Sequence, residues 1–248
     1  MKAEIISVGT ELLLGEITDT NAAYLAGQLP LLGIDLYWIS QVGDNQTRLV
    51  EVLKRAWQRS DLILTTGGLG PTEDDLTREA IAEMLGEELR IDPLLEREIR
   101  ELFARRGIEM APSNIKQAAV IPSAEAIHNA RGTAPGWWVE KDGHILMAMP
   151  GPPREMHRMW HIEVLPRLYQ RATGTIIFSK TIKVFGLPEG TVGELVSPLL
   201  SSANPTLGVY AKADGIHLRF TAKARRQKQA KEMIARGEAK VRSILGRS

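Results

Sequence analysis

A glycine-rich segment is the part of the sequence best suited to chemistry. The apolar run 62–65 leads into Thr66-Gly-Gly-Leu-Gly-Pro-Thr72, which contains Gly67, Gly68 and Gly70. Glycines let backbone N–H groups come close to a ligand, and a helix that begins at Thr72 would add a partial positive charge. The segment therefore predicts a site for a phosphate-type anion, although a plain strand-to-helix turn has the same composition.

Three acids follow this loop and give it a second possible role. Glu73, Asp74 and Asp75 are expected in the first helical turn, where carboxylates favour the helix dipole and Thr72 with Asp75 can form a capping box. A carboxylate beside a phosphate also suits a divalent metal ion, because Mg²⁺-type ions prefer oxygen ligands and bridge carboxylate to phosphate. Both interpretations stay open for Asp74 and Asp75.

Asp44 is a further candidate from another part of the chain. It follows an expected strand at 35–42, and open α/β sheets bind ligands at the carboxyl ends of their strands. Asp44 could therefore face the same crevice as the glycine loop. An aspartate at such a place also has a purely local role in a turn or a helix cap.

The elements that must position these residues alternate between strands and helices. Hydrophobic periodicity and turn signals predict strands at 2–8, 35–42 and 62–65, and helices at 20–32, 47–59, 72–85 and, opened by Asp92 and Pro93, at 93–106. This alternation predicts a three-layer α/β/α domain around a largely parallel sheet. The turn Asp142-Gly143 between two apolar runs predicts a hairpin, so the sheet is expected to be mixed.

A second, smaller domain is expected in the last third of the chain. After Thr173-Gly174 the pattern restarts as strand, helix, two strands and helix. We therefore divide the chain into a first domain at 1–170 and a small α+β domain of βαββα order at 171–248.

Composition limits the class of protein. The 248 residues are 44% hydrophobic and 25% charged, which is typical of a globular chain, and the formal net charge of +1 argues against nucleic acid as a partner. Without cysteine there are no thiolate sites. A membrane span and a signal-peptide pattern are both absent from the sequence, so a cytoplasmic protein is expected.

Seven ordered motifs together resemble the CinA family. They are Gly9-Thr-Glu-Leu-Leu-Leu-Gly15, Asp19-Thr-Asn21, Val42-Gly-Asp44, Thr65-Thr-Gly-Gly-Leu-Gly-Pro-Thr-Glu-Asp-Asp-Leu-Thr77, Asn114-Ile-Lys-Gln-Ala118, Gly132-Thr-Ala-Pro-Gly136 and Pro150-Gly-Pro-Pro-Arg-Glu-Met156. The first part is similar to the molybdopterin-binding domain of molybdenum cofactor assembly. The βαββα segment is similar to the small KH-like domain of CinA proteins.

The resemblance implies metal-dependent hydrolysis of a nucleoside diphosphate sugar, such as ADP-ribose, to AMP and ribose 5-phosphate. It also implies Mg²⁺, Mn²⁺ or Co²⁺ as cofactor and a homodimer. No Ser-Cys-Thr-Gly-Gly-type segment is present, so the deamidase activity of longer family members is not expected from this chain. The segment Gly186-Leu-Pro-Glu-Gly190 lacks the Gly-x-x-Gly clamp of RNA-binding KH modules, which again argues against RNA.

Carried over by motif, the resemblance assigns roles to individual residues. Asp75, Asp44 and Asp74 are the catalytic candidates, with Asp44 and Asp75 as the metal ligands and Asp75 as the first choice. The candidates for substrate binding are Thr66, Gly67, Gly68, Gly70, Thr72, Glu11, Asn21, Lys116, Gly136 and Gly151. The helical pair His157 and His161 is expected at the surface rather than in a zinc site.

Two other functions remain open on the same residues. One is the binding of molybdopterin, or the transfer of an adenylyl group to it, in molybdenum cofactor assembly. The other is a regulatory protein that binds a nucleotide at the glycine loop without turning it over.

Overall fold

The computed structural model describes residues 1–171 and 174–246. They form two compact units, one of residues 1–28 with 35–171 and one of residues 29–34 with 174–246. Thr173, in the expected link between the domains, lies outside the described residues. Within those ranges, none of the helices is long and apolar enough to cross a lipid bilayer.

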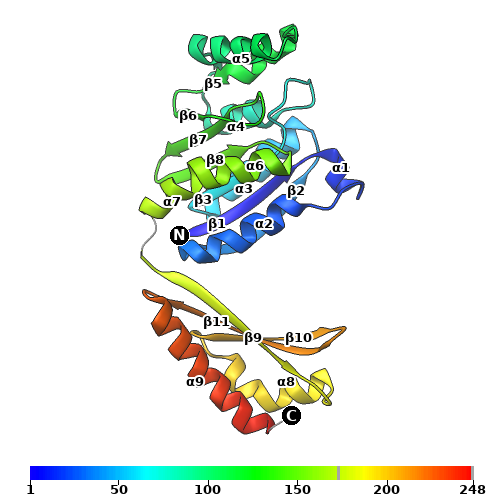
Figure 1. Cartoon of the computed structure of the whole chain (residues 1–248), viewed down its shortest axis with the longest axis vertical. Helices are drawn as coiled ribbons and strands as arrows, with labels where there is room; N and C mark the ends of the chain where they lie inside the picture. Colours follow the sequence, from blue (N-terminus) through cyan, green and yellow to red (C-terminus); the bar gives the residue numbers. More distant parts are fainter. Residues whose placement is uncertain (172–173, 247–248) are drawn as a thin grey trace. The chain divides into compact units, whose positions relative to one another are not determined.

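A six-stranded mixed sheet forms the centre of the first unit (Figure 1). Its order is β2 (Asp35–Val42), β1 (Lys2–Val8), β3 (Leu62–Thr66), β8 (His144–Met149), β7 (Gly136–Lys141) and β6 (Ala124–Ile127). Strands β2, β1, β3 and β8 are parallel, while β7 is antiparallel to both β8 and β6. The mixed sheet predicted from the Asp142-Gly143 turn is confirmed, and both turn residues have the positive φ that a tight hairpin needs.

Helices cover both faces of this sheet and complete the three-layer α/β/α architecture (Figure 1). They are α2 (Thr20–Gln28), α3 (Gln46–Arg59), α4 (Thr77–Leu85), α6 (Pro153–Met159) and α7 (Leu165–Arg171). The one-turn helix α1 (Thr10–Leu13) follows β1, and α5 (Pro93–Arg105) lies beside β5 rather than on the main sheet. Short 3₁₀ or π turns lie at Pro112–Ala118 and Trp160–Val164, and the 3₁₀ turn Leu29–Leu32 belongs to the second unit. A small two-stranded sheet joins β4 (Arg90–Ile91) to β5 (Ala119–Val120).

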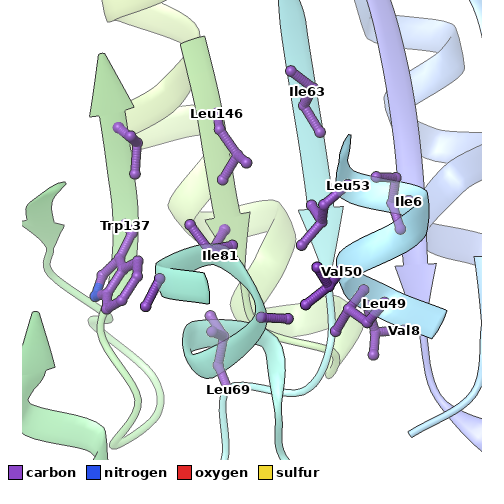
Figure 2. Packing of buried hydrophobic residues seen from close by; sticks show 14 of the residues in the cluster. Ile6, Val8, Leu49, Val50, Leu53, Ile63, Leu69, Ile81, Trp137 and Leu146 are labelled. Atoms are coloured by element: carbon purple, nitrogen blue, oxygen red, sulfur yellow. The ribbon is translucent and has the colours of Figure 1, made fainter. Parts of the chain in front are cut away.

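A cluster of buried hydrophobic residues covers one face of the sheet (Figure 2). Helix α3 contributes Leu49, Val50 and Leu53, which lie on one side of the helix because they follow the helical repeat. They pack against a cluster that includes Ile6 of β1 and Ile81 of α4. Leu69 from the glycine-rich loop joins this cluster, so the loop is held to the core by its own side chain.

Local capping signals placed two helix ends correctly. The Asp92 carboxylate accepts the N–H groups of Leu94 (2.7 Å) and Leu95 (3.1 Å), and Pro93 occupies the first turn of α5. Gly86 ends α4 in the left-handed conformation. These two predictions are confirmed.

Other boundaries differ from the prediction. Helix α4 begins at Thr77 rather than Thr72, because residues 70–76 form turns in which the Thr72 N–H donates to the Asp75 carboxylate. The acids at 73–75 therefore lie before the helix, and the bond between Thr72 and Asp75 belongs to a turn instead of the expected capping box at the helix start. The expected loop 9–18 contains the one-turn helix α1, and the expected helix 20–32 is regular only to Gln28.

The second unit contains the expected βαββα order. It consists of β9 (Ile176–Val184), α8 (Glu189–Leu200), β10 (Thr206–Lys212), β11 (Gly215–Ala224) and α9 (Gln227–Leu245). The strands form an antiparallel sheet in the order β10-β11-β9. Leu218 and Phe220 of β11 are buried with Ile234 of α9, so alternate residues of the strand face the helix. The predicted small α+β domain is thus confirmed as a fold class.

An ion pair between a buried carboxylate of the main sheet and an exposed arginine gives a stability prediction. Glu4 of β1 is fully buried, and Arg59 donates to both its carboxylate oxygens at 2.9 and 2.7 Å. Replacing Arg59 with Met should lower the free energy of unfolding by about 3 kcal/mol, because the carboxylate stays buried without its charged partner and keeps only the Ser40 and Ser60 hydroxyl groups. The measurement is a urea titration followed by circular dichroism. Arg55→Met is the control, since the Arg55–Glu51 pair is exposed and its loss should cost about 0.5 kcal/mol or less. Equal losses in the two variants would contradict the prediction.

Candidate functional site

A cleft of about 780 Å³ opens at the carboxyl ends of the parallel strands. Val8 at the end of β1, Asp44 after β2, Thr66 at the end of β3 and Gly151 after β8 all line it. This is where an open α/β sheet is expected to bind a ligand. The volume is sufficient for a ligand of nucleotide size.

The glycine-rich loop forms one wall of this cleft, and its glycines are required by close contacts. Gly67 has φ of 99°, and a Cβ there would lie 2.2 Å from the Val8 carbonyl oxygen. A Cβ on Gly70 would lie 2.3 Å from Oδ2 of Asp75. Thr77 at the start of α4 donates its hydroxyl to the Gly67 carbonyl at 2.8 Å. The loop therefore has a fixed shape before any ligand binds.

Asp75 and Asp44 each use one carboxylate oxygen to hold a loop. Oδ2 of Asp75 accepts the Thr72 N–H at 3.0 Å and also the Thr72 hydroxyl. Oδ2 of Asp44 accepts the Thr10 N–H at 2.8 Å, and the Thr10 hydroxyl accepts the Asp44 N–H at 3.1 Å. Within the described part of the chain, Oδ1 of each aspartate has no assigned hydrogen bond, which leaves it available to a ligand.

Asn21 reaches the cleft from the start of α2. Its amide Nδ2 donates to the Gly151 carbonyl at 2.7 Å, which joins α2 to the loop after β8. Its Oδ1 is buried and has no partner within the described residues. An unpaired buried acceptor is costly, so Asn21 offers a place for a hydroxyl or amino group of a ligand.

The structure brings most of the candidate residues together. The cleft is lined by Asp44, Asp74, Asp75, Thr66, Gly67, Gly68, Gly70, Thr72, Glu11, Asn21 and Gly151. Contact with Thr72, followed by its own backbone amide, holds the pKa of Asp74 below its usual value. Asp74 is therefore ionised at neutral pH.

Two candidates lie outside the cleft lining. Gly136 is buried in β7, where a Cβ would lie 2.5 Å from the Met159 sulfur, so its lack of a side chain serves packing between sheet and helix. Lys116 donates to the Thr72 carbonyl at 3.0 Å and pairs with Glu79 at 3.2 Å. It supports the glycine loop from behind.

Some lining residues were not singled out from the sequence. Asp19 caps α2 by accepting the Ala22 N–H at 2.9 Å, and Glu155 lies in the first turn of α6. Oε2 of Glu155 accepts Nδ2 of Asn129 at 2.7 Å, which fixes the segment that carries Thr133. Asp19 and Glu155 both belong to motifs of the sequence, but the bond from Asn129 to Glu155 joins separate segments and has no local sequence signal.

The electrostatic character of the lining is strongly acidic. Its carboxylates are Glu11, Asp19, Asp44, Asp74, Asp75 and Glu155, and no lysine or arginine is among the described residues that line it. An anionic ligand would therefore be opposed by side-chain charge and attracted only by backbone N–H groups, unless a cation accompanies it.

The protein by itself has no complete metal site in its described part. No group of three or more histidine, aspartate or glutamate side chains is arranged there to hold an ion. The donor chemistry fits a different mode, because Mg²⁺ is commonly held by one or two carboxylates together with water and substrate phosphates. Asp44 and Asp75 can supply those carboxylates.

An aromatic cluster between α2 and α6 predicts a pH effect on stability. Tyr24 stacks on His157 with ring centroids 3.8 Å apart and forms a 2.7 Å hydrogen bond with Nε2 of His161. The expectation of a surface pair is therefore wrong for His157, which is half-buried.

Burial, and then the charge of His161, holds the pKa of His157 below its usual value. The unfolded chain binds the proton near pH 6.5, so stability should fall as pH decreases from there towards the lower folded pKa.

Melting temperatures across that pH range test this effect. His157→Phe keeps an aromatic ring on Tyr24 and removes the titrating group, so its melting temperature should fall less on acidification than that of the wild type. His128→Asn, at an exposed position, serves as the control and should retain the wild-type slope. An unchanged slope in His157→Phe would show that other groups cause the pH dependence.

Comparison with known proteins gives a consistent result. Residues 4–170 match the family described as probable molybdopterin binding domain, and residues 179–248 match the damage-inducible protein CinA KH domain. A CinA-like protein of Thermomicrobium roseum is 50% identical over 99% of this chain and 61% of its own length. The crystal structure of the protein CinA from Thermoplasma acidophilum is 32% identical and covers 67% of this chain and 98% of that chain, with a TM-score of 0.63. The chain spans about 60% of the length of the curated relatives that it matches.

Proposed function

Because this chain belongs to the CinA family, we propose that it hydrolyses a nucleoside diphosphate sugar such as ADP-ribose with the help of a divalent metal ion. The products are AMP and ribose 5-phosphate. The observation that carries the proposal is a cleft that combines a loop of backbone N–H groups with carboxylates and no lining cation among the described residues. Such a site suits a phosphate that arrives with a metal ion.

Each part of the cleft has a role in this reaction. Backbone N–H groups from Gly68 to Gly70 would bind the pyrophosphate, because the N–H groups of Gly67 and Thr72 already donate within the protein. The free oxygens of Asp44 and Asp75 would hold the ion or orient the attacking water. A bound divalent ion, Mg²⁺, Mn²⁺ or Co²⁺, supplies charge stabilisation and lowers the pKa of water. Oδ1 of Asn21 accepts a hydroxyl group of the substrate.

The alternative is molybdopterin binding, or adenylyl transfer to molybdopterin. It is favoured by the match of residues 4–170 to a family described as a molybdopterin-binding domain. The same loop and acids would then act on a different acceptor. A regulatory protein that binds a nucleotide without turnover would also use the loop, but would not need the free carboxylate oxygens.

A nucleotide panel with Mg²⁺, Mn²⁺ or Co²⁺, read by product chromatography, separates these functions. Release of AMP from ADP-ribose, abolished by EDTA, is the expected result. Adenylylation of molybdopterin from ATP would favour the alternative. Tight nucleotide binding without turnover under every metal would contradict hydrolysis and favour the regulatory function.

A further inference from the structure

Arg78 is a buried cation that the function described above does not use. Its side chain lies in the first turn of α4 with only 1% of its surface exposed. Nη1 donates to the Leu69 carbonyl and Nη2 to the Pro135 carbonyl, each at 2.8 Å. Its Nε has no partner within the described residues, and no ion pair with a carboxylate is assigned to it there. The guanidinium is thus held by two neutral oxygens.

One of these bonds ends at the wall of the cleft and the other ends next to it. Leu69 lines the cleft as part of the glycine-rich loop, and Pro135 directly follows Ala134, which lines it from another segment. Leu69 and Trp137 belong to the same buried cluster (Figure 2), and the guanidinium carbon lies 5.9 Å from the centre of the Trp137 ring. Arg78 therefore bridges two separate wall segments from behind.

The charge of Arg78 is expensive to bury. Desolvation lowers its pKa to about 10, with Glu79 and then Asp75 acting in the opposite direction, so the group remains a cation at neutral pH. Two carbonyl groups do not compensate fully for the lost hydration of a charge. A buried cation is screened less by salt than a surface one. Both hydrogen-bond partners of the guanidinium are neutral, so a phosphate at the glycine loop would add an attractive negative charge on the cleft side of Arg78.

We propose that Arg78 is a positioning residue that fixes the glycine-rich loop against the 133–136 segment and supplies positive charge from behind the wall to a phosphate group in the cleft. The inference rests on the proposed function only in that the ligand carries phosphate. It explains how a cleft whose charged lining residues are all carboxylates, within the described chain, can favour an anion. This role differs from a purely structural one. If Arg78 only held the wall in place, its loss would affect charged and uncharged ligands equally.

The experiment compares AMP with adenosine as probes, since they differ only in the phosphate. Calorimetry on the full chain with Mg²⁺ gives the affinity for AMP and the affinity for adenosine. The variant Arg78→Met removes the positive charge and keeps an apolar side chain of similar length. We expect AMP affinity to fall by about tenfold or more and adenosine affinity to change by about twofold or less. Arg59→Met, which removes a guanidinium away from the cleft lining, should leave the AMP-to-adenosine ratio unchanged.

Arg78→Lys tests the idea if the methionine variant does not fold. The ammonium keeps the charge but is a single point donor that loses its proton readily when buried. At pH 7, the ratio of AMP affinity to adenosine affinity in Arg78→Lys should be close to that of the wild type. This ratio should decrease as the pH rises to about 9, while the wild-type ratio stays constant.

Several results would overturn the proposal. They are equal losses of AMP and adenosine affinity in Arg78→Met, unchanged affinities in that variant, a flat ratio in Arg78→Lys, and a wild type that binds AMP no better than adenosine. Failure of ADP-ribose hydrolysis is a separate outcome, because the binding ratio does not depend on turnover.

Discussion

Asp75→Asn is expected to lower kcat for ADP-ribose hydrolysis by about a hundredfold or more while leaving the melting temperature nearly unchanged. Loss of a metal ligand or a water-orienting group raises the barrier by several kcal/mol, and each 1.36 kcal/mol is about tenfold in rate. The amide keeps an oxygen that can accept the Thr72 N–H, so the local turn is preserved. It cannot offer a second negatively charged oxygen to a metal ion.

The measurement is steady-state kinetics on purified variants at saturating metal, together with thermal unfolding. Asp74→Asn is the matched comparison, because Asp74 also lines the cleft and is a catalytic candidate but is not one of the two expected metal ligands. Its kcat should fall less than that of Asp75→Asn. A near-normal kcat in Asp75→Asn would remove this residue from the catalytic set and leave Asp44 as the principal candidate.

Gly67→Ala should cause a large loss of stability and of phosphate binding together. The left-handed backbone costs a side-chain-bearing residue about 1–3 kcal/mol, and a Cβ placed 2.2 Å from the Val8 carbonyl oxygen adds a similar penalty. We expect the free energy of unfolding to decrease by about 3 kcal/mol or more. Any relief of the overlap must move the loop away from β1.

Gly107→Ala separates the cost of the left-handed backbone from the cost of the close contact with Val8. Gly107 also has positive φ, at 66°, but nothing lies within 4 Å of the place that a Cβ would occupy, so its replacement should cost only about 1 kcal/mol. Urea titration gives both losses, and AMP calorimetry reports the state of the loop. Equal losses for the two glycines would show that the close contact with Val8 is unimportant.

Local sequence signals predicted much of the fold and of the cleft. The Asp92–Pro93 start, the Gly86 stop and the Asp142-Gly143 turn each depend on neighbouring residues alone, and all three appear in the structure. The location of Asp44 near the glycine loop followed from a rule about strand ends. These features need no knowledge of distant contacts.

What could not be predicted depends on pairing across the chain. The start of α4 moved to Thr77 because the Asp75 carboxylate binds Thr72 and the Thr77 hydroxyl binds the Gly67 carbonyl, whereas the acids alone suggested a helix cap. Gly136 was taken as a site residue from its motif, but its neighbours are Met159 and the Ala148 carbonyl. The buried position of Arg78 gave no local signal, since a charged residue in a helix is ordinarily solvated.

The hydrogen bond from Asn21 to the Gly151 carbonyl has a consequence for protein synthesis. Strand β3 must pair with β8, so Leu62 finds its partner Ile145 only after most of the first domain has been made. Pairing of this kind is slow, because a long loop must close first. A nascent chain therefore cannot complete the cleft until the residues up to Glu155 have left the ribosome. Nucleotide capture by ribosome-bound chains of increasing length should begin abruptly once this segment is exposed.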